Sequence, residues 1–351
     1  MAGECENRRA IDRMSPHMPI SPLPPPAVVW AESPLQLLSA VEAQHAGLLG
    51  DGTEVALRAG SQSLAATAEE VLRLGMPPGL CPPAPASRVA RPPRDGRWVI
   101  GDAFSGAVQR RLLSSGGRRL LVVDDGLATI HLLELLTAPA PRPLARARAR
   151  LGVPRRALGL AAAARLRAAA RAGALTVFTA LPIPAELHAA VEALGARLVC
   201  HDFPWLRGRP AAPPPSQRLV VLGSSLVHNG LVHRRPYLEW VLALADTEPL
   251  AYRPHRRECP EVLAELRRHP RIMVAEPTGV PVEISLRGLT AEHWVVSLPS
   301  TALTSLRLVL RAAGTTIEGV PVPADWWTAD ADPELRAHLS LFVGGGLEIA
   351  T

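Results

Sequence analysis

The fold is decided by the stretch His293-Trp294-Val295-Val296-Ser297-Leu298-Pro299-Ser300-Thr301-Ala302-Leu303. The first five residues predict a buried strand, and the apolar spacing after Ser300 predicts a helix that runs to about Ala313. A helix start exposes unpaired backbone N–H groups and the positive end of the helix dipole. Ser300 and Thr301 therefore indicate either a phosphate site or simple N-capping by Ser300, which needs no ligand.

The same strand–turn–helix unit recurs along the chain. The apolar runs 27–31, 120–123 and 219–222 each end in a turn or cap sequence, and helical patterns follow them. Strands that alternate with helices predict parallel sheets and an α/β fold. We expect a disordered leader over 1–26, with Met14 or Met18 as alternative starts. Two Rossmann-like domains over 27–205 and 217–325, a Pro-rich linker over 206–216 and a tail helix within 326–351 complete the prediction.

Composition excludes some function classes. The chain has 351 residues, of which 48% are hydrophobic and 4% aromatic, and all 38 basic residues are Arg. An all-Arg composition reflects a GC-rich coding sequence as much as function, and few aromatic side chains are present to stack on bases, so we expect no nucleic-acid partner. The four cysteines, at positions 5, 81, 200 and 259, show no metal-ligand spacing. No apolar run reaches the ~20 residues of a membrane span, and we expect a cytoplasmic protein.

Residues 142–171 form an unusual basic segment. They contain nine arginines and no acidic residue. We expect two helices here, broken near Gly152-Val153-Pro154. A helical insert with a solvated face is the favoured interpretation, because its apolar side is mostly Ala. Peripheral contact with an anionic surface at the inner face of the membrane, or with an anionic glycan, is the alternative.

Several polar residues follow predicted strands, where ligands of parallel sheets collect. Asp124 and Asp125 are placed to act there, although an Asp-Gly turn explains them equally. Arg253 and His255 could hold an anionic leaving group, with His255 donating a proton, or form a basic surface loop. Glu283 could accept hydrogen bonds from a ribose diol or stabilise a helix N-terminus.

Five motifs together resemble the bacterial sialyltransferases of glycosyltransferase family 52 and the related polysialyltransferases. They are Ser-Pro-Leu-Gln at 33–36, Asp-Asp-Gly at 124–126, Tyr-x-Pro-His-x-x-Glu at 252–258, Pro-x-Glu at 281–283 and Ser-Leu-Pro-Ser-Thr at 297–301. The match spans about 27–320. It implies a GT-B fold, in which two Rossmann-like domains face each other across a cleft.

The resemblance also implies a CMP-sialic acid donor, a glycan acceptor, inversion at the anomeric carbon, and no metal or other cofactor. One acid of the Asp124–Asp125 pair is the expected base, with Asp124 favoured, and His255 is the third expected catalytic residue. Arg256 stands where the family has a proline. The donor-binding residues implied are Gly126, Gly223, Ser224, Arg253, Glu283, Ser297, Ser300 and Thr301, and the substrate loop implied is Ser33, Pro34 and Gln36.

Two other functions fit the same sequence. A GT-B transferase could use a nucleotide diphosphate sugar or another CMP-activated nonulosonic acid. A catalytically silent protein could bind nucleotide or glycan on the same scaffold.

Overall fold

The computed structural model describes residues 25–87, 96–114, 119–146 and 152–343. The first half contains β1 (Ala27–Ala31), α1 (Pro34–His45), β2 (Glu54–Leu57), α2 (Gln62–Leu74), β3 (Ala84–Pro85), β4 (Arg97–Ile100), α3 (Gly106–Ser114), β5 (Arg119–Val123), α4 (Leu127–Thr137), α5 (Val153–Arg171), β6 (Leu175–Thr179), α6 (Ala185–Ala193) and β7 (Arg197–Cys200). These strands form a seven-stranded parallel sheet in the order β3-β2-β1-β4-β5-β6-β7.

The second half begins after the short helix α7 (Pro204–Arg207). It contains β8 (Leu219–Leu222), α8 (Ser225–His228), α9 (Arg234–Thr247), β9 (Leu250–Arg253), α10 (Pro260–Leu266), β10 (Ile272–Val274), α11 (Val282–Ser285), β11 (Trp294–Ser297), α12 (Thr301–Leu310), β12 (Thr316–Gly319), the 3-10 turn η1 (Ala324–Trp326) and α13 (Pro333–Ser340). Its five parallel strands lie in the order β10-β9-β8-β11-β12.

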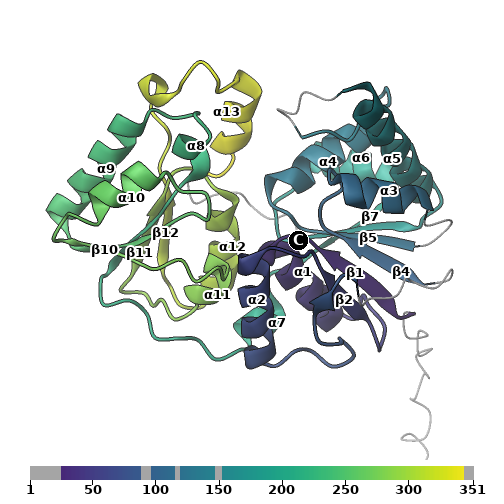
Figure 1. Cartoon of the computed structure of the whole chain (residues 1–351), viewed down its shortest axis with the longest axis horizontal. Coiled ribbons are helices and arrows are strands. Elements are labelled where there is room, and N and C mark those ends of the chain that lie inside the picture. Colours follow the sequence, from purple (N-terminus) through teal and green to yellow (C-terminus); the bar gives the residue numbers. More distant parts are fainter. Residues whose placement is uncertain (1–24, 88–95, 115–118, 147–151, 344–351) are drawn as a thin grey trace, which may run out of the picture.

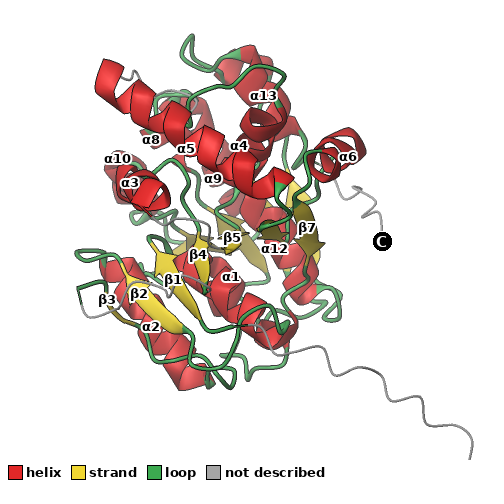
Figure 2. Cartoon of the chain, turned by 90° about the vertical axis from the view of Figure 1, so that its right-hand side faces the viewer, coloured by secondary structure: helices red, strands yellow, loops and turns green. Residues whose placement is uncertain are grey.

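The strand sequences are apolar on both faces because helices cover both faces of each sheet. In β1, Val29 and Ala31 pack into one core cluster with α1 and α2. Val28 and Trp30 point the other way, into a second cluster with α3, α4 and α5. Figure 2 shows these two layers of helices on opposite sides of the sheet. The fold is therefore mixed α/β with two Rossmann-like domains, which lie side by side in Figure 1, as the sequence predicts.

The helix α7 lies where the chain leaves the first domain. Trp205 is 1% exposed, and α7 contacts both α1 and α12. Two carboxylate oxygens of the buried Glu42 in α1 accept hydrogen bonds from the backbone N–H groups of Trp205 and Leu206, at 3.0 and 2.9 Å. Glu42 thus fixes the start of the connection between the domains.

The tail returns to the first domain. His338 in α13 lies 3.0 Å from Glu134 in α4, measured from Nε2 to Oε1. Phe342 is 1% exposed and packs with Ile130 and Leu181. Figure 1 shows α13 above the boundary between the two domains. The tail therefore ties the second half of the chain to the first.

The prediction of two helices in 142–171 is wrong for the part that the structure describes. Residues 142–146 are not helical, residues 147–151 lie outside the described residues, and α5 is one helix that begins at Val153. Its Ala-rich side packs against α3 and α4. Arg146 and Arg155 make bonds within the domain, to Asp102 and to Gln109. Residues 1–24 of the predicted leader lie outside the described residues. No helix in the described part of the chain is both long and apolar enough to cross a lipid bilayer.

Candidate active site

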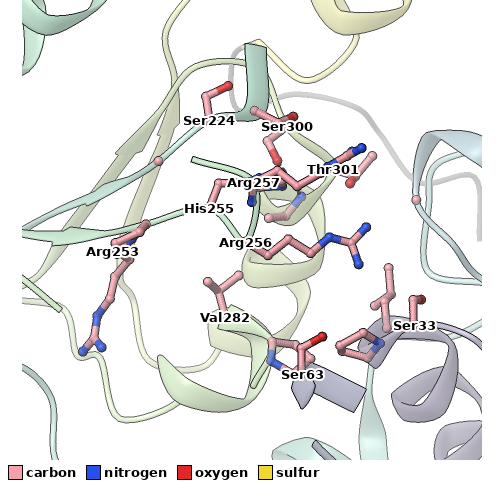
Figure 3. Close-up of a pocket in the computed structure, with 18 of the residues that line it drawn as sticks. Ser33, Ser63, Ser224, Arg253, His255, Arg256, Arg257, Val282, Ser300 and Thr301 are labelled. Atoms are coloured by element: carbon pink, nitrogen blue, oxygen red, sulfur yellow. Dashed lines mark hydrogen bonds between the residues drawn. The ribbon is translucent and has the colours of Figure 1, made fainter. Parts of the chain in front are cut away.

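A cavity of about 480 Å³ lies between the two domains, at the carboxyl ends of strands from both sheets. This volume is typical of small-molecule sites, which span roughly 300–1,000 Å³. Figure 3 shows Ser33 on one side and the residues after β8, β9 and β11 on the other. The lining includes eleven of the residues predicted from sequence: Ser33, Pro34, Asp125, Gly126, Gly223, Ser224, Arg253, His255, Glu283, Ser300 and Thr301. Asp124, Gln36 and Ser297 do not line it.

The wall from the first domain carries the Asp125 carboxylate. Ser33 Oγ donates a hydrogen bond of 3.0 Å to Asp125 Oδ1, and the Gln36 side chain donates a second one. The Gln36 amide is oriented because its oxygen accepts from the backbone N–H of Glu32 at 2.8 Å. Burial and, to a smaller extent, the negative charge of the nearby Asp102 carboxylate raise the pKa of Asp125 to about 7. The two hydrogen bonds lower this pKa, but by less than burial raises it. Asp125 is therefore poised to take up a proton near neutral pH.

Asp124 does not fit the role of base. It is 3% exposed, and its oxygens accept hydrogen bonds from Thr129 Oγ1 at 2.7 Å, Thr179 Oγ1 at 2.9 Å and the backbone N–H of Ala180 at 3.1 Å. These bonds tie the end of β5 to α4 and to the end of β6. Of the two predicted acids, Asp125 lines the cavity, whereas Asp124 points into the sheet edge with its oxygens occupied, which does not favour Asp124 as the base.

The wall from the second domain is built on a buried acid, Glu258. Its Oε2 accepts hydrogen bonds from Tyr252 Oη at 3.0 Å and from the backbone N–H of His255 at 3.1 Å. Tyr252 in turn lies 2.8 Å from the hydroxyl of Tyr237. A Cβ atom at Gly223 would collide with Glu258 Oε2 and lie 2.8 Å from His255 N. Glycine is therefore required at 223 so that the loop after β9 can pack onto the turn after β8.

Three arginines of this loop line the cavity: Arg253, Arg256 and Arg257. None of the three guanidinium groups forms a hydrogen bond or ion pair that the structure shows with any described residue, and Arg253 Nε is buried without a partner. Arg256 and Arg257 are exposed. A cluster of cations without protein carboxylates is suited to an anionic ligand. Sequence reasoning singled out only Arg253, although Arg256 and Arg257 lie inside the same motif.

His255 is held in one tautomer. Its Nδ1 accepts a hydrogen bond of 3.1 Å from the backbone N–H of Arg257, so that the neutral ring carries its hydrogen on Nε2. Burial, and then the charges of Arg256 and Arg257, lower the pKa of His255 to about 4. In the neutral form, Nε2 of His255 can donate a hydrogen bond to a ligand. The transfer of a proton from His255 to a leaving group stays a prediction.

The stretch 293–303 forms the predicted strand, turn and helix, with α12 ending at Leu310. Ser300 caps this helix, its Oγ accepting from the backbone N–H of Ala302 at 3.3 Å, and its hydroxyl hydrogen is still available to a ligand. Thr301 closely faces the first domain, because a Cβ at Gly126 would lie 3.1 Å from Thr301 Oγ1, and Gly126 has a φ of 68°. Ser297, predicted to bind the donor, is 1% exposed and donates to the carbonyl of Leu222 at 3.2 Å, a structural role.

The lower part of the cavity combines α11, the loop before it and α2. Glu283 is 5% exposed; burial raises its pKa, against hydrogen bonds that include one from the Ser305 side chain. Thr67 Oγ1 in α2 lies 3.3 Å from the carbonyl of Gly279, so this loop touches the first domain. Ser63, in the first turn of α2, also lines the cavity. Ser63 lies in no sequence motif, because its place beside the loop depends on how the domains dock.

No group of three or more His, Cys, Asp or Glu side chains within the described ranges is arranged to hold a metal ion. No protein-family model matches the chain, and neither does any curated protein. Among solved structures, the crystal structure of Acinetobacter baumannii MurG aligns with 91% of this chain and 83% of its own, at 10% identity and a TM-score of 0.34. So distant a likeness carries no argument about activity, and the fold assignment rests on the two parallel sheets themselves.

Proposed function

We propose that the protein is an inverting glycosyltransferase that moves sialic acid from CMP-sialic acid to a hydroxyl of a glycan. The observation that carries the proposal is the pairing of the two walls. One wall presents Asp125, a carboxyl group whose pKa is about 7. The other presents arginines that have no carboxylate partner among the described residues, a neutral His255 and the start of α12. A base that faces an anion-binding wall is the arrangement needed for transfer from a donor with an anionic leaving group.

In the proposed reaction the acceptor oxygen forms a bond with the anomeric carbon while the bond from that carbon to the phosphate oxygen breaks. Asp125 accepts the proton of the acceptor hydroxyl, and CMP leaves with the electron pair. Because the attacking and leaving oxygens come from opposite walls, a single displacement inverts the anomeric configuration. Fixed donors that point at the departing phosphate stabilise the negative charge it gains.

The second domain would hold CMP. The candidates for the phosphate are Ser300, Thr301, the Nε2–H of His255 and the Arg257 guanidinium, since these residues line the cavity and lie near one another in Figure 3. Glu283 is the candidate for the ribose diol, as a buried carboxyl group that faces the same cavity. Gly223 and Ser224 form the turn below the phosphate subsite. No cofactor or metal enters the proposal, since arginines and the helix start supply the positive charge.

The proposal is tested by calorimetric titration of the purified protein with CMP, UDP and GDP in EDTA, followed by a transfer assay with CMP-sialic acid. We expect CMP alone to bind, and His255→Ala to weaken that binding. The matched control is His269→Ala, at a partly buried position near Asp246 and outside the cavity. Binding of UDP or GDP instead would point to a nucleotide diphosphate sugar. CMP binding without transfer to any acceptor or to water would point to a silent binding protein.

A further inference from the structure

The cavity holds more positive charge than the phosphate of CMP requires. In CMP-sialic acid the phosphate is a diester with one negative charge, and it gains a second only as the sugar leaves. The start of α12, the Nε2–H of His255 and one guanidinium group match that demand. Yet three arginines line the cavity, and none of their guanidinium groups has a carboxylate partner that the structure shows among the described residues. A second anionic group on the donor accounts for the surplus.

The arginines extend in different directions. Figure 3 shows the Arg256 side chain reaching from the loop toward the side of the cavity where Ser33 lies, whereas Arg253 extends the opposite way. Ser33 is hydrogen-bonded to Asp125 at 3.0 Å. Arg256 is close enough to His255 for its charge to lower the pKa of that ring. Arg256 therefore extends from the anion-binding wall toward the wall that carries the base.

This middle region is where the reacting carbon must lie. An in-line displacement places the anomeric carbon between the leaving phosphate oxygen and the attacking acceptor oxygen. In a nonulosonic acid such as sialic acid that carbon carries a carboxylate, whereas in an ordinary aldose it carries a hydrogen atom. A guanidinium group offers two parallel N–H donors that match a carboxylate, and Arg256 has no protein group that competes for them in the described structure.

We infer that Arg256 binds the carboxylate on the anomeric carbon of the donor sugar and makes the enzyme selective for donors that carry this group. The inference rests on the proposed function, which it deepens. In this inference Arg256 binds the carboxylate of the sugar, and Arg257 binds the phosphate.

The test compares three ligands that do not turn over: CMP, 3-fluorinated CMP-sialic acid, and the C1 methyl ester of that analogue, in which the carboxylate is neutral. Their affinities are measured by calorimetry for the wild-type protein, Arg256→Gln and the matched variant Arg257→Gln. For the wild-type protein we expect the acid to bind about 10- to 100-fold more tightly than the ester, as for one charge-assisted hydrogen-bond pair. In Arg256→Gln this preference is lost and the affinity for CMP is retained. In Arg257→Gln all three ligands bind more weakly and the preference remains.

The outcomes separate the inference from the proposed function. If the wild-type protein binds none of the three ligands, the proposed function fails and the inference fails with it. If CMP binds but Arg256→Gln still prefers the acid to the ester, or loses affinity for CMP as well, only the role of Arg256 is overturned. Thermal melting of both variants checks folding, and no loss is expected because neither side chain bonds to a described residue.

Discussion

Ser33 Oγ donates a hydrogen bond of 3.0 Å to Asp125 Oδ1, and this bond joins the first turn of α1 to the end of β5. Ser33 also caps α1, because its Oγ accepts from the backbone N–H of Gln36 at 3.4 Å. One hydroxyl thus begins a helix and orients the candidate base. The Ser33 side chain therefore has both a structural role, as a helix cap, and a role in the candidate site.

We expect substitution of Asp125 to lower activity and substitution of Asp124 to lower stability. Asp125→Asn removes the base and should lower kcat by about 10²- to 10⁴-fold, with the melting temperature and CMP affinity retained. Asp124→Asn instead replaces one of two accepting oxygens with an NH₂ group, which faces either Thr129 Oγ1 or the pair Thr179 Oγ1 and Ala180 N, and should destabilise the fold by about 1–3 kcal/mol. Steady-state kinetics and thermal melting measure the two effects. A folded Asp125→Asn enzyme with full activity would overturn the assignment.

The value of kcat/KM should increase as the pH is raised through about 7. The base acts only when ionised, and the pKa of Asp125 is raised to about 7 by burial and by Asp102, so the ionised fraction increases as pH increases through that value. Ser33→Ala removes a hydrogen bond that favours the ionised form, and the midpoint of kcat/KM against pH should move to higher pH.

The control for that profile is Ser61→Ala. Ser61 caps α2, its Oγ accepting from Leu64 N at 3.3 Å, so the variant loses a helix cap of similar kind. Because Ser61 does not contact Asp125, its midpoint should stay at the wild-type value. Equal shifts in the two variants would show that a lost cap, and not the bond to Asp125, moves the profile.

Gly223→Ala should damage nucleotide binding. The new methyl group would collide with Glu258 and lie 2.8 Å from His255 N, so the loop that carries His255 and the arginines must shift. We expect weaker CMP affinity together with a lower melting temperature. Gly208→Ala is the control, since its Cβ would meet only ordinary contacts at 3.5 Å. Unchanged CMP affinity in Gly223→Ala would contradict the packing described for Glu258.

The buried Glu42 predicts how stability depends on pH. Burial raises its pKa from 4.5 to about 7 despite the hydrogen bonds from Leu206 and Trp205. A group with a raised pKa in the folded state contributes its full stability below about pH 4.5 and loses it as pH rises through about 7. The difference amounts to about 3 kcal/mol. Urea unfolding at several pH values should therefore give a flatter profile for Glu42→Gln than for the wild-type protein, and parallel profiles would contradict this account.

The strands and the edge of the sheet where ligands collect were predictable from sequence, because their signals are local. Runs such as 120–123 are apolar at every position, as expected for strands covered on both faces, and the motif residues follow such runs. The roles of Asp124 and Asp125 could not be separated in this way. Adjacent side chains at a strand end point to opposite sides, and the contacts from Thr179 of the neighbouring strand β6 and Thr129 of α4 determine which acid is occupied.

The places of Ser297 and Ser63 also depend on contacts between distant segments, so sequence did not predict them. Ser297 lies in a motif, but its hydroxyl bonds to the backbone of the adjacent strand β8, a pairing that no local pattern encodes. Ser63 lies in no motif and reaches the cavity through the docking of one domain on the other. The nine arginines of 142–171 predicted a helical insert with a solvated face, and sequence could not show that Arg146 and Arg155 bond to residues of their own domain.

Phe342 and its neighbours Ile130 and Leu181 bear on how this protein can be divided. If the chain were cut within residues 210–217, each fragment would expose an apolar surface that is buried in the intact chain. The second fragment would expose the ring of Phe342, and the first would expose Ile130 and Leu181, against which that ring packs. Neither fragment should behave as an independent module. Co-expressed fragments should instead recognise each other, so that the gene could be split into a complementing pair whose activity reports their encounter.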